Sequence, residues 1–299
     1  MPEIVEIRKY ADFLKRKLKN KTINEIKILK GRYKTHGPFQ NYYSIIKKLP
    51  LKVLDVKTKG KFLYFIFEDD YYLFSTLGLH GGWVFYNNDT FQFNTLIKYA
   101  ESERMEKYRK SALNNLNVEF VTKYGSIFYF DTLSFGTLKI IKGDIELNKK
   151  LNLIGPDIME PSTTINLFTE RLLKSKNLNK KIGIVLMDQK VISGIGNYLR
   201  ADVLWSSKIS PFRKVKDLTE KEINNIYNIT RTLTWASYDY PKGIKLKTIK
   251  KNIKLPYTYK RNFFVYGQEN DIYGNKIIKK ELFEGSQKRF IYYVKELQL

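Results

Sequence analysis

Apolar residues in the first half of the chain recur with two different periods. Between Val5 and Leu18 they fall three and four positions apart, which is the spacing of one helical face. From Ile23 to Ile141 short aromatic and β-branched runs such as KFLYFIF and GGWVFY alternate with glycine and asparagine. This second pattern is typical of strands. The sequence therefore predicts an N-terminal helix followed by a β-sandwich or barrel-like domain.

Helical spacing returns in the second half. The stretch LNLIGPDIMEP, residues 151–161, carries two prolines and a glycine between differently patterned halves and predicts a linker. Helical periodicity then extends from Thr163 to Tyr238. Within it, Thr219 followed three positions later by Glu222 is a capping box, which predicts the start of a helix that runs towards Tyr238.

The last segment alternates like strands, and the FEGS sequence at residues 283–286 predicts a hairpin turn. The whole pattern predicts an α+β chain of two domains. The expected divisions are a β-rich domain over residues 1–148, a linker over 149–161, a helical domain over 162–262 and a terminal hairpin over 263–299.

The composition indicates which class of partner the protein binds. A content of 43% hydrophobic and 15% aromatic residues is globular, and the net charge of +24 favours a polyanion, with nucleic acid as the leading partner. The abundance of Lys, Ile, Asn and Tyr also fits an AT-rich coding genome, which would supply lysine without any function. No apolar run is long enough to span a membrane, and no signal-peptide pattern follows Met1. We expect a soluble intracellular protein without a membrane partner.

The chain has no cysteine and two histidines, His36 and His80. This composition excludes disulfides, thiolate nucleophiles and cysteine-ligated zinc, and two histidines alone do not form a metal cage. We expect no metal and no cofactor. Any chemistry must use amines, carboxylates or hydroxyls.

A Gly-x-Gly-Asn turn precedes a helix in ISGIGNYLRADVLWSSKISP, residues 192–211. Its glycines permit a tight turn whose backbone amides and Asn197 side chain can face an anion, although an ordinary helix junction would show the same four residues. Together with LMDQK at 186–190, the stretch resembles the helix–two-turn–helix element of the formamidopyrimidine-DNA glycosylase and endonuclease VIII family. The start of the chain resembles the family's start, and EIR followed by AD and L favours the endonuclease VIII branch.

The resemblance implies a two-domain α+β fold and a bifunctional DNA glycosylase and AP lyase that removes oxidised bases, pyrimidines more than purines. The implied partner is damaged DNA, double- or single-stranded, bound by a monomer. A non-catalytic DNA-binding protein on the same scaffold is the alternative, and the presence of Pro2, Glu3 and Lys61 argues against it. A basic RNA-binding protein would explain the charge but not the ordered blocks.

The first residues carry the implied catalytic groups. Pro2 is implied as the nucleophile once removal of Met1 frees its secondary amine, and an α-amino group with a pKa of roughly 7.7 to 8.0 is partly neutral at physiological pH. The resemblance makes Glu3 the general acid and base and Glu6 an organiser of the site. Three positions apart, both are expected on one face at the positive end of the first helix, where such charges also serve simply to complement the helix. Val5 departs from the family's usual proline.

Two further blocks are implied to contact DNA. Lys61 in KTKGKFLYFIF falls on the family's strand lysine near the scissile phosphate, although three close lysines also suit a solvated strand entrance. Leu79 in STLGLHGGW falls on the side chain that fills the void left by an extruded base, and plain core is the alternative. Leu133 and Ser134 stand where the family commonly has an arginine before Phe-Gly, which predicts weak or altered reading of the opposite base.

The C-terminal QKRFIYYVKELQ, residues 287–298, resembles the family's zinc-finger hairpin, with Arg289 at the position of the finger arginine that grips phosphates. Val294 and Leu297 occupy positions of two metal-binding cysteines, and the other pair is absent too. The resemblance therefore implies a zincless finger held by apolar packing.

Overall fold

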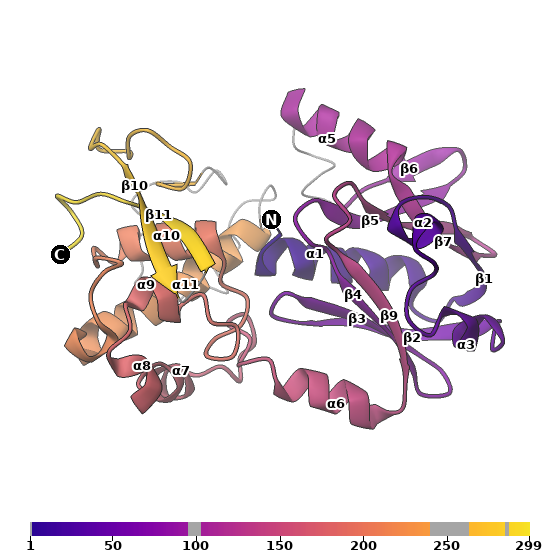
Figure 1. The fold of residues 1–299 in the computed structure, drawn as a ribbon, viewed down its shortest axis with the longest axis horizontal. Coiled ribbons are helices and arrows are strands. Elements are labelled where there is room, and N and C mark those ends of the chain that lie inside the picture. The colour runs from indigo at the N-terminus through magenta and orange to yellow at the C-terminus, as the bar shows by residue number, and fades with distance from the viewer. Residues whose placement is uncertain (1, 95–102, 240–262, 285–286) are drawn as a thin grey trace. The chain divides into compact units, whose positions relative to one another are not determined.

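The computed structural model describes residues 2–94, 103–239, 263–284 and 287–299. The chain forms two compact units (Figure 1). The first holds Glu6–Asn152 together with Pro2, and the second holds Leu153–Leu299 together with Glu3–Val5. The divisions predicted from the sequence stay predictions, and their segments 240–262 and 285–286 lie outside the described residues.

Helix α1 (Ile4–Leu18) opens the fold and presents one apolar face to the sandwich core. The four residues at the predicted spacing, Ile7, Ala11, Leu14 and Leu18, are all buried. The remaining helices of the first unit are α2 (Arg32–Thr35), α3 (Tyr42–Ile46), α5 (Glu103–Asn114) and α6 (Asp144–Asn152). Helix α6 continues through the first four residues of the predicted linker.

The strands of the first unit are β1 (Thr22–Ile28), β2 (Leu51–Lys59), β3 (Phe62–Phe67), β4 (Tyr71–Thr76), β5 (Gly81–Asn87), β6 (Thr90–Gln92), β7 (Leu116–Thr122), β8 (Gly125–Asp131) and β9 (Thr137–Lys142). Within the described residues they pair antiparallel in the order β6-β5-β8-β7-β1-β2-β3-β4-β9. Phe65 of β3 and Trp83 of β5 are far apart in this order, yet their rings lie 5.0 Å apart. The array therefore closes over one aromatic core as a β-sandwich, and the predicted fold class is confirmed.

The second unit is built around a buried helix. Its helices are α7 (Ile165–Leu172), α8 (Ser175–Leu178), α9 (Ile182–Val185), α10 (Asn197–Ser206), the 3₁₀ turn η1 (Val215–Asp217) and α11 (Glu220–Asp239). Tyr198 to Trp205 of α10 are all buried, which is expected of a helix surrounded by protein on every side. Helices α9 and α10, with the turns between them, form the helix–two-turn–helix element.

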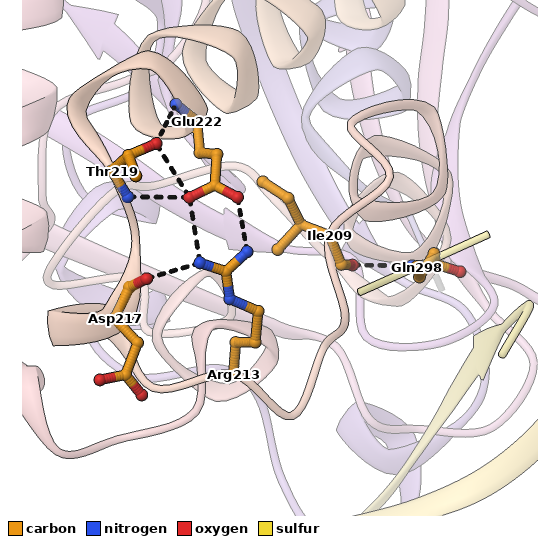
Figure 2. Close-up of polar contacts among 6 residues, drawn as sticks. All are labelled: Ile209, Arg213, Asp217, Thr219, Glu222 and Gln298. Atoms are coloured by element: carbon orange, nitrogen blue, oxygen red, sulfur yellow. Dashed lines mark hydrogen bonds and ion pairs between the residues drawn. The ribbon is translucent and has the colours of Figure 1, made fainter. Parts of the chain in front are cut away.

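The terminal strands β10 (Ile278–Glu284) and β11 (Gln287–Tyr293) pair antiparallel, with Leu282 opposite Arg289. The two central residues of the predicted FEGS turn lie outside the described residues. Leu282, Ile291 and Val294 are buried, so apolar packing holds this hairpin in a chain without cysteine. Gln298 fixes the end of the chain, because its amide donates to Ile209 O at 2.9 Å (Figure 2). Its carbonyl also accepts from the Val294 N–H at 2.8 Å.

The predicted capping box at the start of α11 is present. Thr219 N donates to Glu222 Oε2 at 2.8 Å, and Glu222 N donates back to Thr219 Oγ1 at 3.3 Å (Figure 2). Arg213 adds a two-pronged ion pair to the same carboxylate. Hydrogen bonds from Arg213 lower the pKa of Glu222 to about 2.

No helix among the described residues has the length and apolar character needed to span a bilayer.

Replacing Glu222 by Gln should lower the free energy of unfolding at pH 7 by about 1 to 2 kcal/mol, because it removes a charge-assisted pair and half of the capping box. The folded pKa lies below the ordinary value near 4.3, so this stabilisation is complete above pH of about 4.3 and disappears as the pH falls towards about 2. Urea unfolding at a series of pH values measures the difference. Glu220→Gln, an exposed change in the same turn, is the control and should show no such convergence with the parent.

Candidate active site

One glutamine shapes the turn that leads into α10. Gln189 Nε2 donates to Ile195 O at 2.9 Å, and its Oε1 accepts from Gly194 N at 2.9 Å. Gly194 has a φ of +106°, a backbone conformation that favours glycine. Gln189 belongs to the LMDQK block, so the two blocks that carried the resemblance are bonded to each other.

The turn presents its amides to a carboxylate of the chain itself. Glu3, 1% exposed, accepts hydrogen bonds from Gly196 N at 2.8 Å, Tyr198 N at 2.9 Å and Leu199 N at 3.3 Å. These are the unpaired amides of the first turn of α10, where the helix dipole favours negative charge. Three N–H donors of this kind favour the ionised carboxylate.

The position of Glu3 corrects one sequence expectation and decides another. The expectation that Glu3 shares a face with Glu6 at the positive end of the first helix is wrong, because α1 begins at Ile4 and only Glu6 lies in its first turn. The sequence left open whether the Gly-x-Gly-Asn amides face an anion or form an ordinary helix junction. Amides of this turn do bind a carboxylate, which comes from Glu3 of the same chain, 193 positions away in sequence.

Gly196 allows this close approach. A Cβ atom added there would lie 2.1 Å from Glu3 Cδ and 2.2 Å from Glu3 Oε1. Both distances are far below van der Waals contact, so any side chain at this position would displace the carboxylate.

Arg200 is a buried cation one turn into α10. It is 1% exposed, and its guanidinium donates to Gly183 O at 2.8 Å, to Asn197 Oδ1 at 3.2 Å and to Phe290 O at 2.8 Å. These acceptors lie on α9, α10 and β11. One side chain therefore ties the hairpin to the helix–two-turn–helix element and orients Asn197.

The charges around Arg200 connect it with Glu3 and Arg289. Burial is the main cause that lowers the pKa of Arg200 to about 10; Glu3 and Tyr266 act to raise this pKa, and Arg289 acts to lower it. Arg289 is partly exposed on β11. Of the predicted site residues, the second unit thus brings together Glu3, Asn197 and Arg289.

A second buried acidic residue on α10, Asp202, binds the backbone of residues 264–266, which lie before the hairpin. Asp202 Oδ1 accepts from Val265 N at 3.1 Å and from Tyr266 N at 3.4 Å. Burial raises the pKa of Asp202 to about 7, against the lowering effect of the backbone N–H groups of Val265, Phe264 and Tyr266.

The predicted site residues of the first unit lie on its turns and termini. Pro2 is partly buried and directly precedes Glu3, and Glu6 lies in the first turn of α1. Lys61 was expected on a strand, but it lies in the two-residue turn between β2 and β3, where Gly60 has a φ of +56°. A two-residue hairpin with positive φ at its first central position favours glycine there, and Lys61 is the second residue of this turn.

Leu79 is 40% exposed in the turn between β4 and β5, so it is not plain core. Leu133 and Phe135, in the loop between β8 and β9, are 46% and 62% exposed. The two loops touch, because a Cβ at Gly78 would lie 2.7 to 2.9 Å from atoms of Phe135 and Gly136. The first unit therefore presents three apolar side chains on adjacent loops.

Among the described residues, no three His, Asp or Glu side chains are grouped as metal ligands would be.

The Asp271 carboxylate organises the turn that precedes the hairpin. Asp271 accepts hydrogen bonds from Trp205 Nε1 at 3.1 Å, Tyr273 N at 2.9 Å and Asn275 N at 2.9 Å. Burial acts to raise the pKa of Asp271, and hydrogen bonds from Asn275 and Trp205 outweigh it, so this pKa lies below its ordinary value.

Sequence reasoning missed Arg200, Asp271 and the side-chain role of Gln189. A signal existed for Arg200, because a lone arginine inside an apolar helix needs buried acceptors. Nothing in the pattern distinguished Asp271 from the other polar residues of a turn.

This fold and its pairing of sandwich with helix–two-turn–helix unit are those of a known class of DNA glycosylase. The formamidopyrimidine-DNA glycosylase of Lactococcus lactis, solved with DNA containing an abasic site, shares the fold with a TM-score of 0.75 and 23% identity over 100% of both chains. Another structure of that protein, non-covalently bound to AP-site DNA, gives a TM-score of 0.73 and 20% identity over 99% of both chains.

Sequence comparison defines the family. The model of the formamidopyrimidine-DNA glycosylase N-terminal domain matches residues 1–138, and that of its H2TH domain matches residues 154–244. The chain belongs to the formamidopyrimidine-DNA glycosylase family. It is 28% identical to formamidopyrimidine-DNA glycosylase of Mycoplasma genitalium, covering 79% of this chain and 75% of the relative, and 26% identical to endonuclease 8 of Escherichia coli, covering 80% of each.

Because Gly196 and Glu3 are in contact, we expect substitutions at these two positions to have non-additive effects on the free energy of unfolding. Gly196→Ala should lower the free energy of unfolding by about 1 to 3 kcal/mol, because the added methyl group overlaps the Glu3 side chain. In a Glu3→Ala background, which lacks the overlapping atoms, the same substitution should cost clearly less. Urea unfolding of the four proteins of this cycle measures the coupling. Equal costs in the two backgrounds would show that the carboxylate does not occupy the turn in solution.

Proposed function

We propose that this protein is a bifunctional DNA glycosylase and AP lyase of base excision repair, in which the Pro2 nitrogen forms a Schiff base with the damaged nucleotide. The observation that carries the proposal is the placement of Glu3. A buried carboxylate, directly bonded in sequence to Pro2, is fixed by three amides of the helix–two-turn–helix element. Family membership supports the glycosylase activity, and this geometry supports the finer mechanism.

The substrate nucleotide is rotated out of the duplex, because its glycosidic bond is inaccessible within the base stack. The neutral secondary amine of Pro2 attacks C1′ of the sugar while the bond from C1′ to the base breaks. Base departure and ring opening leave an iminium between the proline nitrogen and C1′. Elimination from this intermediate then cleaves the strand on the 3′ side by β-elimination and on the 5′ side by δ-elimination.

Glu3 handles the proton of this exchange. As Pro2 forms its new bond, its nitrogen must lose a proton, and an ionised carboxylate on the adjacent residue is the nearest acceptor in the chain. Glu3 then returns the proton to the ring oxygen of the sugar as the ring opens. The fixed amides hold Glu3 in one orientation through both transfers, and Glu6 organises the same end of the chain.

The remaining predicted residues are proposed to bind DNA. Lys61 contacts a phosphate beside the cleaved bond and assists elimination. Arg289 and Asn197 grip backbone phosphates from the second unit, with Asn197 oriented by its bond from Arg200. Leu79 fills the void that the extruded nucleotide leaves, a use for which its exposure is suited. The sandwich is then the catalytic domain, and the helical unit with its zincless finger is the DNA-binding domain.

Oxidised pyrimidines are the proposed lesions. The start of the chain is similar to the endonuclease VIII branch, and Leu133 and Ser134 replace the arginine that the family commonly uses at the opposite base. Without that guanidinium, the proposed enzyme distinguishes the opposite base weakly.

Borohydride trapping on abasic DNA tests the proposed nucleophile. Protein from which Met1 has been removed should form a stable covalent complex with the abasic strand, because borohydride reduces the iminium to an amine. Protein that retains Met1 should not, since its proline nitrogen is part of an amide. Pro2→Gly, which offers a primary amine, should keep some trapping. Equal trapping of the blocked and processed proteins would exclude Pro2 as the nucleophile.

If the hairpin is a zincless finger that binds DNA, Arg289→Ala should change DNA affinity and its dependence on salt. Loss of a guanidinium that binds phosphate oxygens should weaken binding to every lesion alike and reduce the salt-dependence slope by about one phosphate contact. Because the hairpin is held by Leu282, Ile291 and Val294, a chelator should change neither the melting temperature nor activity. Stoichiometric zinc in metal analysis, or an unchanged salt slope in Arg289→Ala, would contradict this assignment.

A further inference from the structure

A basic cavity lies in the first unit beside the loop that carries Leu133 and Phe135. Its volume is about 390 Å³. Three segments contribute its lining: helix α2, the turn that follows it and the edge strand β9. The basic lining residues are Arg32, His36 and Lys139, and no carboxylate lines the cavity.

Arg32 is held in place from one side. Its Nη1 donates to Ser134 O at 3.2 Å and to Gly136 O at 3.3 Å. These bonds use one edge of the guanidinium and fix its plane against the loop. The hydrogen bonds that the structure gives Arg32 leave Nη2 and Nε as donors, and guanidinium donors in a fixed plane match the oxygens of a phosphate.

The cations that line the cavity form no ion pair among the described residues, and the nearby buried carboxylate, Asp131, accepts hydrogen bonds from Leu133 N and Gly136 N. Within the described part of the chain, neither Lys139 nor His36 forms an ion pair, and Arg32 binds only carbonyl oxygens. Elsewhere in the same unit, exposed lysines do have carboxylate partners, as Lys27 has Glu25 at 3.1 Å. A group of cations in a concave site favours an anionic ligand.

We propose that this cavity binds one phosphodiester of the DNA backbone, which Arg32 and Lys139 contact together. The inference rests on the proposed function and adds a phosphate contact from a surface that none of the predicted site residues occupies. The ligand belongs to a chain rather than being a free anion, because the cavity adjoins the exposed Leu133 and Phe135, whose apolar side chains suit contact with DNA bases. Arg32 thus serves twice, as a phosphate ligand and as a support of the loop.

We test the site with Lys139→Ala rather than with a substitution of Arg32. Loss of Arg32 would remove both the phosphate contact and the hydrogen bonds that support the loop. Binding of the full chain to a duplex with a stable abasic-site analogue is measured by anisotropy over a range of salt concentrations. Lys139→Ala should weaken binding about tenfold at low salt and reduce the slope of log K against log salt by about one. Lys27→Ala removes the same charge from a neutralised position and should leave the slope unchanged.

A DNA-side substitution locates the phosphate. Single methylphosphonates, which remove one backbone charge, are placed at each position near the abasic site. One position should weaken binding by the parent strongly and binding by Lys139→Ala clearly less, because Lys139→Ala has already lost one of the two cations that contact this phosphate. If every methylphosphonate affects Lys139→Ala as strongly as the parent, or if Lys139→Ala keeps the parent's salt slope, the cavity binds no backbone phosphate.

Borohydride trapping and duplex binding distinguish failure of the proposed lyase function from failure of the proposed phosphate site. A parent protein that binds the duplex with this pattern but is never trapped by borohydride would refute the lyase and keep the phosphate site. A parent that is trapped normally while Lys139→Ala matches it throughout would refute the phosphate site and keep the lyase.

Discussion

The contact between the Glu3 carboxylate and the first turn of α10 is the interaction on which the site depends. It joins residues almost 200 positions apart and satisfies amides that a helix terminus otherwise leaves unpaired. Removing the carboxylate would leave buried donors without an acceptor, which costs about 1 to 3 kcal/mol for each group, and adding a side chain at Gly196 would expel it. The same three bonds therefore stabilise the second unit and fix the position of the residue next to Pro2.

Buried polar residues do for the C-terminal hairpin what a metal ion would do for a finger with cysteines. Arg200 bonds to the backbone of β11, Asp271 gathers the N–H groups of the preceding turn, and Gln298 ties the end of the chain to Ile209. Each of these side chains forms hydrogen bonds within the unit, and these bonds fix the geometry of the hairpin. The apolar residues Leu282 and Val294 complete the hairpin. A finger can thus keep its arginine on β11 without any thiolate.

Local patterns predicted those features that depend on neighbours in sequence. The apolar face of α1, the capping box of Thr219 and Glu222 and the strands of the terminal hairpin follow from spacing alone, and the structure has all three. The partner of Glu3 could not be predicted in this way, because it depends on how segments 193 or more positions apart meet. Lys61 was placed on a strand since the run KFLYFIF begins with it, but Lys61 belongs to the turn with Gly60 and β3 begins one residue later, at Phe62.

Arg200 also decides where proton transfer can occur. Its pKa of about 10, lowered mainly by burial, still keeps the guanidinium charged at neutral pH. The positive charge near Glu3 is therefore constant, and together with the amides of α10 it favours the ionised carboxylate in the resting protein. A carboxylate stabilised in this form is a weaker base than a free one, so it accepts a proton only from a strongly acidic donor and gives that proton up readily. In the proposed reaction the donor is the Pro2 nitrogen, which becomes acidic when its new bond to C1′ gives it a positive charge.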